Sequence, residues 1–138
     1  MINKNRLVKI SVAVVVVAVL GILILDGIFP KAEKLALPDK AYVVSVTAGS
    51  DSMEKTELSP GEYERLFVMM SNVKPTRKQS VNDYPYVRPY YTVSVATAEA
   101  EYRYFVYSED SQVYVEQPYV GVYKSDGQLL DFILSNKK

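Results

Sequence analysis

The sequence has no cysteine and no histidine among its 138 residues, and these two absences exclude whole classes of protein. Without cysteine the chain has no disulfide, no thiol nucleophile, no lipid-modified cysteine and no zinc knuckle. Without histidine it has no Ser-His-Asp triad and no imidazole metal ligand. We therefore expect no metal and no cofactor, and an enzyme would have to rely on carboxylates, hydroxyls or lysine alone.

An excess of charge of one sign is also lacking, since 16 Lys and Arg balance 16 Asp and Glu. A neutral chain has no general attraction to nucleic acid, so we expect no nucleic-acid partner. Residues 39–138 carry 11 basic and 14 acidic side chains, a net charge of −3. This part of the chain should therefore not adhere to anionic lipid or wall polymers through bulk charge.

The sequence begins with a long hydrophobic run. Residues 10–25 are apolar except for Ser11, and apolar neighbours on both sides extend the segment to residues 7–29. Crossing a bilayer takes about 20 residues, and the absence of water there favours a helix despite the many valines. The run therefore predicts one transmembrane helix.

The charges that flank this run predict its orientation. Lys4, Arg6 and Lys9 lie at its N-terminal end, whereas Asp26 lies at its C-terminal end. Basic residues stay on the cytoplasmic side of a membrane. The pattern predicts a single-pass protein with residues 1–6 in the cytoplasm and the C-terminal domain outside it.

A cleaved signal peptide is the alternative interpretation, because it has the same basic start and apolar run. Such a peptide ends in a small-x-small cleavage site, and residues 25–30 (LDGIFP) contain no A-x-A-like triplet. We therefore expect an uncleaved anchor in the cell membrane, with secretion after cleavage as the alternative. Residues 30–40, which contain two prolines, are expected to form a juxtamembrane linker.

Residues 41–136 are expected to form one extracytoplasmic domain, which is long enough to bury a core without disulfides. Residues 41–47 are rich in β-branched side chains and predict a strand. Alternating patterns separated by short polar turns predict an antiparallel meander over residues 90–98, 101–107 and 112–116. Residues 119–123 would add a short edge strand after Pro118.

Two capping boxes predict helices. Ser59 and Glu62 flank a proline at the first helical position, and apolar residues then recur on one face over residues 60–71. Ser125 and Gln128 form the second box, before a wide apolar stripe. The order β-α-β-β-β-(β)-α predicts an α+β fold, an antiparallel sheet of four to five strands with two helices on one face, preceded by the transmembrane helix.

All 12 tyrosines lie between Tyr42 and Tyr123. Alternation places Tyr102 and Tyr104 on one face of the sheet and Tyr107 on the other. One interpretation is core and cross-strand packing, where aromatic rings fit well. The other is an exposed platform for a protein or a glycan, on the face that the helices leave free.

Residues 74–89 are expected to form a long irregular loop, which in so small a domain is either functional or mobile. The loop interleaves basic and aromatic residues, the composition of interface hot spots, although its arginines could equally pair with nearby glutamates in solvent. Residues 116–119 form either a ligand-binding corner or a structural one. The candidate partner-binding residues are Arg77, Lys78, Tyr84, Tyr86, Arg88, Tyr90, Glu116 and Tyr119.

Carboxylates are the remaining option for catalysis, as in a two-carboxylate glycosidase. The candidates lie in two polar turns and comprise Asp51, Glu54, Glu57, Glu109 and Asp110. Both turns have the composition of solvated turns, and no nucleophile or phosphate-binding motif is present. We therefore expect no catalytic residues, with a carboxylate-dependent hydrolase as a minor alternative.

Three stretches resemble a family of domains of unknown function. They are KPT at residues 74–76, SVNDYP at residues 80–85 and YVEQPYVGVY at residues 114–123, where E-Q-P-Y-x-G-x-Y is the most specific piece. The resemblance covers roughly residues 43–134. It implies a small extracytoplasmic domain of Gram-positive bacteria, held by one N-terminal membrane helix or by a lipidated cysteine that is absent here. No catalytic residue follows from it.

Two functions agree with these observations. The first is a non-catalytic protein-interaction or regulatory module that binds another envelope protein. The second is a module that binds cell-wall carbohydrate or peptide, with tyrosine rings stacked on sugar faces.

Overall fold

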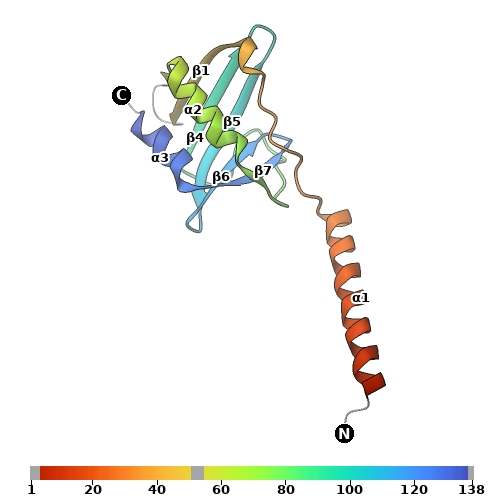
Figure 1. Ribbon diagram of the computed structural model, residues 1–138. Helices are drawn as coiled ribbons and strands as arrows, with labels where there is room; N and C mark the ends of the chain where they lie inside the picture. Colours follow the sequence, from red (N-terminus) through yellow and green to blue (C-terminus); the bar gives the residue numbers. More distant parts are fainter. Residues whose placement is uncertain (1–3, 51–54, 137–138) are drawn as a thin grey trace. The chain divides into compact units, whose positions relative to one another are not determined.

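The computed structural model describes residues 4–50 and 55–136, and the chain divides into two compact units, Met1–Lys31 and Ala32–Lys138. The described part of the first unit is mainly one helix, α1 (Lys4–Ile28) (Figure 1). Within α1, the 21 residues Val8–Ile28 are long and apolar enough to cross a membrane. A signal sequence passes the same test, so the helix is either an anchor or a signal sequence.

The second unit has a short 3-10 helix, η1 (Lys40–Tyr42), two α-helices and seven strands among its described residues. The α-helices are α2 (Pro60–Ser71) and α3 (Gly127–Ser135). The strands are β1 (Val43–Ser50), β2 (Thr56–Glu57), β3 (Lys74–Pro75), β4 (Tyr90–Thr97), β5 (Glu101–Glu109), β6 (Gln112–Gln117) and β7 (Gly121–Ser125).

The seven strands form one antiparallel sheet in the order β2-β1-β4-β5-β6-β7-β3. The predicted α+β class is confirmed, but the prediction of four to five strands was too low. The strands β2 and β3 were missed because each has only two residues, too few to show an alternating pattern.

Helices α2 and α3 lie on the same face of the sheet (Figure 1). α2 buries Leu66, Phe67 and Met70 against it, and α3 buries Leu129, Phe132 and Ile133. Valines and tyrosines that point to this face of the sheet complete the main core. The helix predicted over residues 60–71 is confirmed.

The two predicted capping boxes have different outcomes. At α2 the Glu62 carboxylate accepts hydrogen bonds from the backbone N–H and the hydroxyl of Ser59, both at 2.7 Å. At α3 the N-cap residue is Asp126, whose side chain accepts a hydrogen bond from the Gln128 N–H at 3.2 Å. The prediction that Ser125 is the N-cap residue of this helix was therefore wrong. Ser125 is the last residue of β7, one position too early.

Residues 32–38, called the N-terminal strap below, belong to the second unit and pack on its sheet and core, although they were expected to belong to a linker. Leu35 is buried in the main core. The Ala32 N–H donates to the Thr76 carbonyl at 3.0 Å, just beyond β3. The domain therefore starts about ten residues before its first long strand.

Candidate functional site

The face of the sheet opposite the helices carries an aromatic cluster, formed by Tyr90, Phe105, Tyr107, Tyr114 and Val122. The rings of Tyr90 and Phe105 meet edge to face with centroids 5.3 Å apart. The residues between these positions belong to the main core, because successive side chains of a strand point to opposite faces. The sheet is thus apolar on both faces.

Residues 76–89, called the covering loop, pack on the aromatic cluster. Val87 contacts the cluster, and Pro85 is buried. The Tyr84 ring lies 5.7 Å from the Phe105 ring, centroid to centroid. Of the two interpretations that the sequence left open, the exposed platform does not hold for Tyr90, Tyr107 and Tyr114, because they are buried on this face. Apolar surface on the second face needs a cover, and the irregular loop supplies it.

Glu116 of β6 ties the covering loop to the sheet. Its side chain is only 7% exposed, and one carboxylate oxygen accepts from the Ser80 hydroxyl at 2.7 Å. The other accepts from the Tyr107 hydroxyl at 3.2 Å. A buried carboxylate is costly unless its oxygens are hydrogen bonded, and here both are. Burial first, and then the Glu116 charge, raise the pKa of Tyr107 above its usual value.

Lys78 fixes the covering loop at a second point. Its ammonium group pairs with Glu109 at the end of β5 and lies 4.3 Å from the centroid of the Tyr114 ring. The hydrogen bond to Glu109 is the main cause that raises the Lys78 pKa. Both charged groups are partly exposed, so the pair contributes little energy but restricts the loop.

Tyr119 lies in the β6–β7 turn and binds the covering loop from the outside. Its hydroxyl donates to Asp83 at 2.9 Å, and this hydrogen bond is the main cause that raises the Tyr119 pKa. Its φ of 62° is left-handed, a conformation that disfavours a residue with a side chain. The turn thus holds an aromatic residue in an uncommon backbone conformation at the surface.

The ends of β6 and β7 that flank this turn also fix the N-terminal strap, together with Tyr104 of β5. The Gln117 side-chain carbonyl accepts from the Ala36 N–H at 3.3 Å, and the Tyr104 hydroxyl donates to the Ala36 carbonyl at 2.5 Å. Gly121 leaves room for Ala32, because a Cβ added there would lie 2.3 Å from the Ala32 Cβ. The stretch from Glu116 to Gly121 therefore joins the sheet, the covering loop and the strap.

Three of the candidate binding residues are exposed, and together they are called the tyrosine surface below. Tyr84, Tyr86 and Tyr119 are 52%, 87% and 66% exposed. The first two lie on the covering loop, and the third is bonded to it through Asp83. A protein partner could contact these rings without displacing any part of the fold.

The other candidates lie beside or beneath this surface. Arg88 is exposed with its guanidinium carbon 5.4 Å from the centroid of the Tyr90 ring, and Arg77 is half-buried. Tyr90 and Glu116 are buried, at 3% and 7% exposed. Their side chains support the covering loop from below, so any effect they have on binding acts through its position.

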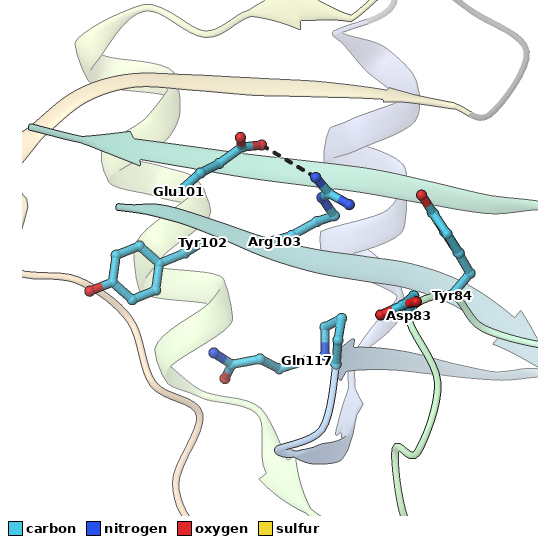
Figure 2. A pocket seen from close by; sticks show the side chains of 7 residues that line it. Asp83, Tyr84, Glu101, Tyr102, Arg103 and Gln117 are labelled. Carbon is cyan, nitrogen blue, oxygen red and sulfur yellow. Dashed lines mark ion pairs between the residues drawn. The ribbon is translucent and has the colours of Figure 1, made fainter. Parts of the chain in front are cut away.

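An open hollow of about 340 Å³ adjoins the tyrosine surface (Figure 2). It is lined by Asp83, Tyr84, Glu101, Tyr102, Arg103, Gln117 and Pro118. Glu101 and Arg103 project from β5, and Asp83 and Tyr84 face them from the covering loop. The pair formed by Glu101 and Arg103 is loose, since its nitrogen and oxygen are 3.9 Å apart and both side chains are exposed.

Tyr84 is the only residue lining this hollow that was on the list of candidate binding residues. Gln117 and Pro118 belong to the corner at residues 116–119 that the sequence left open, and Asp83, Glu101 and Arg103 were not on the list. The charged side chains of Glu101 and Arg103 alternate with aromatic ones along a predicted strand, and this signal marks a polar position on an otherwise apolar face. That Asp83 and Gln117 lie beside them depends on contacts between distant segments, which alternation does not reveal.

The carboxylates considered for catalysis do not converge where the structure describes them. Glu57 is exposed on β2, and Glu109 pairs with Lys78. Asp110 lies in the turn between β5 and β6, with a φ of 50°. Asp51 and Glu54 lie outside the described residues. Within residues 4–50 and 55–136 no group of three acidic side chains is placed to hold a metal ion.

Fold and site together define a small α+β domain in which helices cover one face of an antiparallel sheet and a tied loop covers the other. The sequence matches the family DUF5301, described as "Domain of unknown function (DUF5300)", over residues 31–124. The chain therefore belongs to this family of domains of unknown function. The matched region begins at the N-terminal strap.

One solved structure, described as "NMR structure of the protein from Ruminococcus gnavus", is similar to this chain, with a TM-score of 0.62 and 25% sequence identity. The similarity covers 72% of this chain and 99% of that chain. It supports the fold of the second unit. No curated protein matches the sequence.

Proposed function

We propose that this protein is a single-pass, membrane-anchored module that binds another protein of the cell envelope through its tyrosine surface. In this proposal α1 stays in the membrane, residues 1–6 are cytoplasmic, and the α+β domain lies outside. The basic residues before the helix and Asp26 near its end support this orientation. The proposal also includes an origin in Gram-positive bacteria and a family signature of the form E-Q-P-Y-x-G-x-Y.

The observation that carries the proposal is the exposure of Tyr84, Tyr86 and Tyr119 on a loop that is itself fixed to the sheet. Tyrosine rings are enriched at binding hot spots because they offer a large apolar area with a polar tip. The bonds from Ser80 to Glu116 and from Tyr119 to Asp83 hold the loop in place before any partner arrives. A preorganised surface loses less conformational entropy on binding.

The proposed role is not catalytic. Its support is chemical, because histidine and cysteine are absent from the sequence and the carboxylates that were considered for catalysis do not converge among the described residues. A regulatory or scaffolding role for such a module requires only binding.

Photo-cross-linking in intact cells tests the proposal. A photo-reactive amino acid replaces Tyr86 in the full-length chain, and the matched control replaces Asp131, which is exposed on α3. We expect a discrete protein adduct from position 86 only. The yield of this adduct should fall at least tenfold when the chain also carries Tyr119→Ala. The same adduct pattern from both positions, or no protein adduct, would contradict the proposal.

A second candidate is binding of a wall glycan. The observation in its favour is the 87% exposure of Tyr86, since a free ring can stack on the apolar face of a sugar. Sedimentation of the detergent-solubilised chain with isolated wall material separates the two candidates. Loss of sedimentation on Tyr86→Ala, with no protein adduct in cells, would favour the glycan.

A further inference from the structure

One edge of β5 is open beside the tyrosine surface. The Thr97 N–H donates to the Ala100 carbonyl at 2.8 Å, so the backbone groups of Ala100 face β4. Along a strand these groups point alternately to the two sides. The N–H and C=O groups of Glu101 and Arg103 therefore point away from β4, toward the side where β6 lies.

Strand β6 does not reach these two residues. The ladder between β5 and β6 runs from Glu109↔Gln112 to Phe105↔Glu116 and covers no earlier residue of β5. Continuing the register would place Pro118 opposite Arg103, and proline has no N–H to donate. The chain turns away at this point, so among the described residues only β4 pairs with this part of β5, and no strand pairs with it on the other side.

The hollow of about 340 Å³ occupies the place that a longer β6 would have filled. Residues of β5 (Glu101, Tyr102 and Arg103) form one wall, and Gln117 and Pro118 at the end of β6 form the other. Figure 2 shows the turn after Gln117 bending away from β5. Unpaired backbone donors and acceptors thus face a space open to solvent, which we call the β5 slot.

We propose that the β5 slot binds an extended, basic segment of the partner protein, which adds to the sheet beside Glu101 and Arg103. Strand addition of this kind uses backbone hydrogen bonds for affinity and neighbouring side chains for specificity. The lining carries two carboxylates, Asp83 and Glu101, and one guanidinium, Arg103. This balance favours lysine or arginine in the incoming segment.

The Tyr84 ring borders the same hollow and gives an apolar contact to the incoming segment. The inference rests on the proposed function, because it identifies the kind of segment that the partner of the tyrosine surface presents. It adds a backbone contact that the tyrosine surface alone does not require.

Hydrogen exchange of the free, full-length chain in detergent micelles tests the slot itself. The amide of Arg103 should exchange at least tenfold faster than the amides of Phe105 and Tyr107, which face β6 inside the ladder. Equal protection of all three amides would show that the edge is closed and would overturn the proposal.

A peptide titration followed by amide chemical shifts tests the ligand class. The probe is a five-residue peptide of sequence TKVKT with blocked ends. One control is TEVET, which reverses the charge. The other is TKVKT methylated at every backbone nitrogen, which keeps the side chains but has no backbone donor. We expect TKVKT to shift the amides of residues 101–103 and to bind at least tenfold more tightly than either control. Equal binding of the three peptides, or no shift at these residues, would overturn the proposal.

A pair of charge variants completes the test. Glu101→Lys should weaken TKVKT binding about tenfold, and Glu99→Lys, an exposed position in the neighbouring turn that does not line the hollow, should leave it unchanged. Equal effects of the two variants would contradict recognition in the slot. If the photo-cross-linking at position 86 gives a protein adduct but TKVKT does not bind, only the proposal of the β5 slot is refuted. If TKVKT binds but no protein adduct forms in cells, the proposed function is refuted.

Discussion

Each of four residues in the six-residue stretch 116–121 makes a different structural contact. Glu116 holds the covering loop, and Gln117 holds the N-terminal strap. Tyr119 binds the loop from outside, and Gly121 admits the strap. The sequence left open whether this stretch is a ligand-binding or a structural corner. The structural task is evident from these contacts, and Tyr119 also carries exposed aromatic surface.

Gly121→Ala should destabilise the domain by about 1–3 kcal/mol, because the new methyl group would overlap the Ala32 Cβ. Ala32→Gly removes that Cβ, so the double variant should recover most of the loss. Chemical unfolding followed by the circular dichroism of the tyrosines measures all three chains. A double variant that is no more stable than Gly121→Ala would contradict the proposed contact.

Alkaline pH should destabilise the domain through its buried tyrosines. Burial is the main cause that raises the pKa of Tyr104 and of Tyr107 above the ordinary value of 10.0. Above pH 10 the unfolded chain releases these protons and the folded chain keeps them, so stability that is complete below pH 10 is lost as the pH rises. The slope should be about 1.4 kcal/mol per pH unit for each tyrosine.

Urea unfolding at about pH 8 and about pH 11 measures this loss. In the Tyr107→Phe variant this side chain has no proton to release, so the fall of the unfolding free energy with pH should be smaller by the contribution of one tyrosine. The variant also lacks the hydrogen bond to Glu116. A free energy of unfolding that is the same at both pH values would contradict this account.

The covering loop is the element that sequence reasoning described least well. Its irregular backbone, its prolines and its mixture of basic and aromatic residues were all visible in the sequence. Its docking on the second face was not, because it depends on Ser80 meeting Glu116, which lies 36 residues further along the chain. Local patterns contain no information about such a pair.

Ser80→Ala should loosen the covering loop, because it removes a hydrogen bond to a buried carboxylate that is worth about 1.5–3 kcal/mol. Trypsin should then cleave faster after Lys78, which lies at the start of the loop. The matched control is Ser108→Ala, an exposed serine on β5. Equal cleavage of the two variants would show that the bond to Glu116 does not hold the loop.

The elements that followed local rules were predicted well. Helix α2 and the long strands β4, β5 and β6 show clear periodicity or alternation in the sequence, and each lies close to its predicted position. The two-residue strands and the strap lack such a signal, because only pairing with distant residues defines them. For the site, the tyrosines stood out in the sequence as a group, but which of them are buried depends on the covering loop.

At the scale of the whole molecule, a long apolar helix precedes a domain whose sheet is covered on both faces. The covered sheet leaves two features for a partner: the tyrosine surface and the β5 slot beside it. In the proposed function both features bind a protein of the cell envelope. The proposal therefore requires that the domain lies on the outer side of the membrane.

Cysteine accessibility in intact cells measures this location most directly, because the natural chain has no cysteine and each introduced thiol reports alone. Single substitutions Glu99→Cys in the domain and Asn5→Cys before the apolar run are treated with a membrane-impermeant maleimide. The account predicts labelling of Glu99→Cys on intact, membrane-bound protein and labelling of Asn5→Cys only after the cells are lysed. Labelling of Asn5→Cys but not Glu99→Cys in intact cells, or release of the labelled domain into the medium, would contradict it.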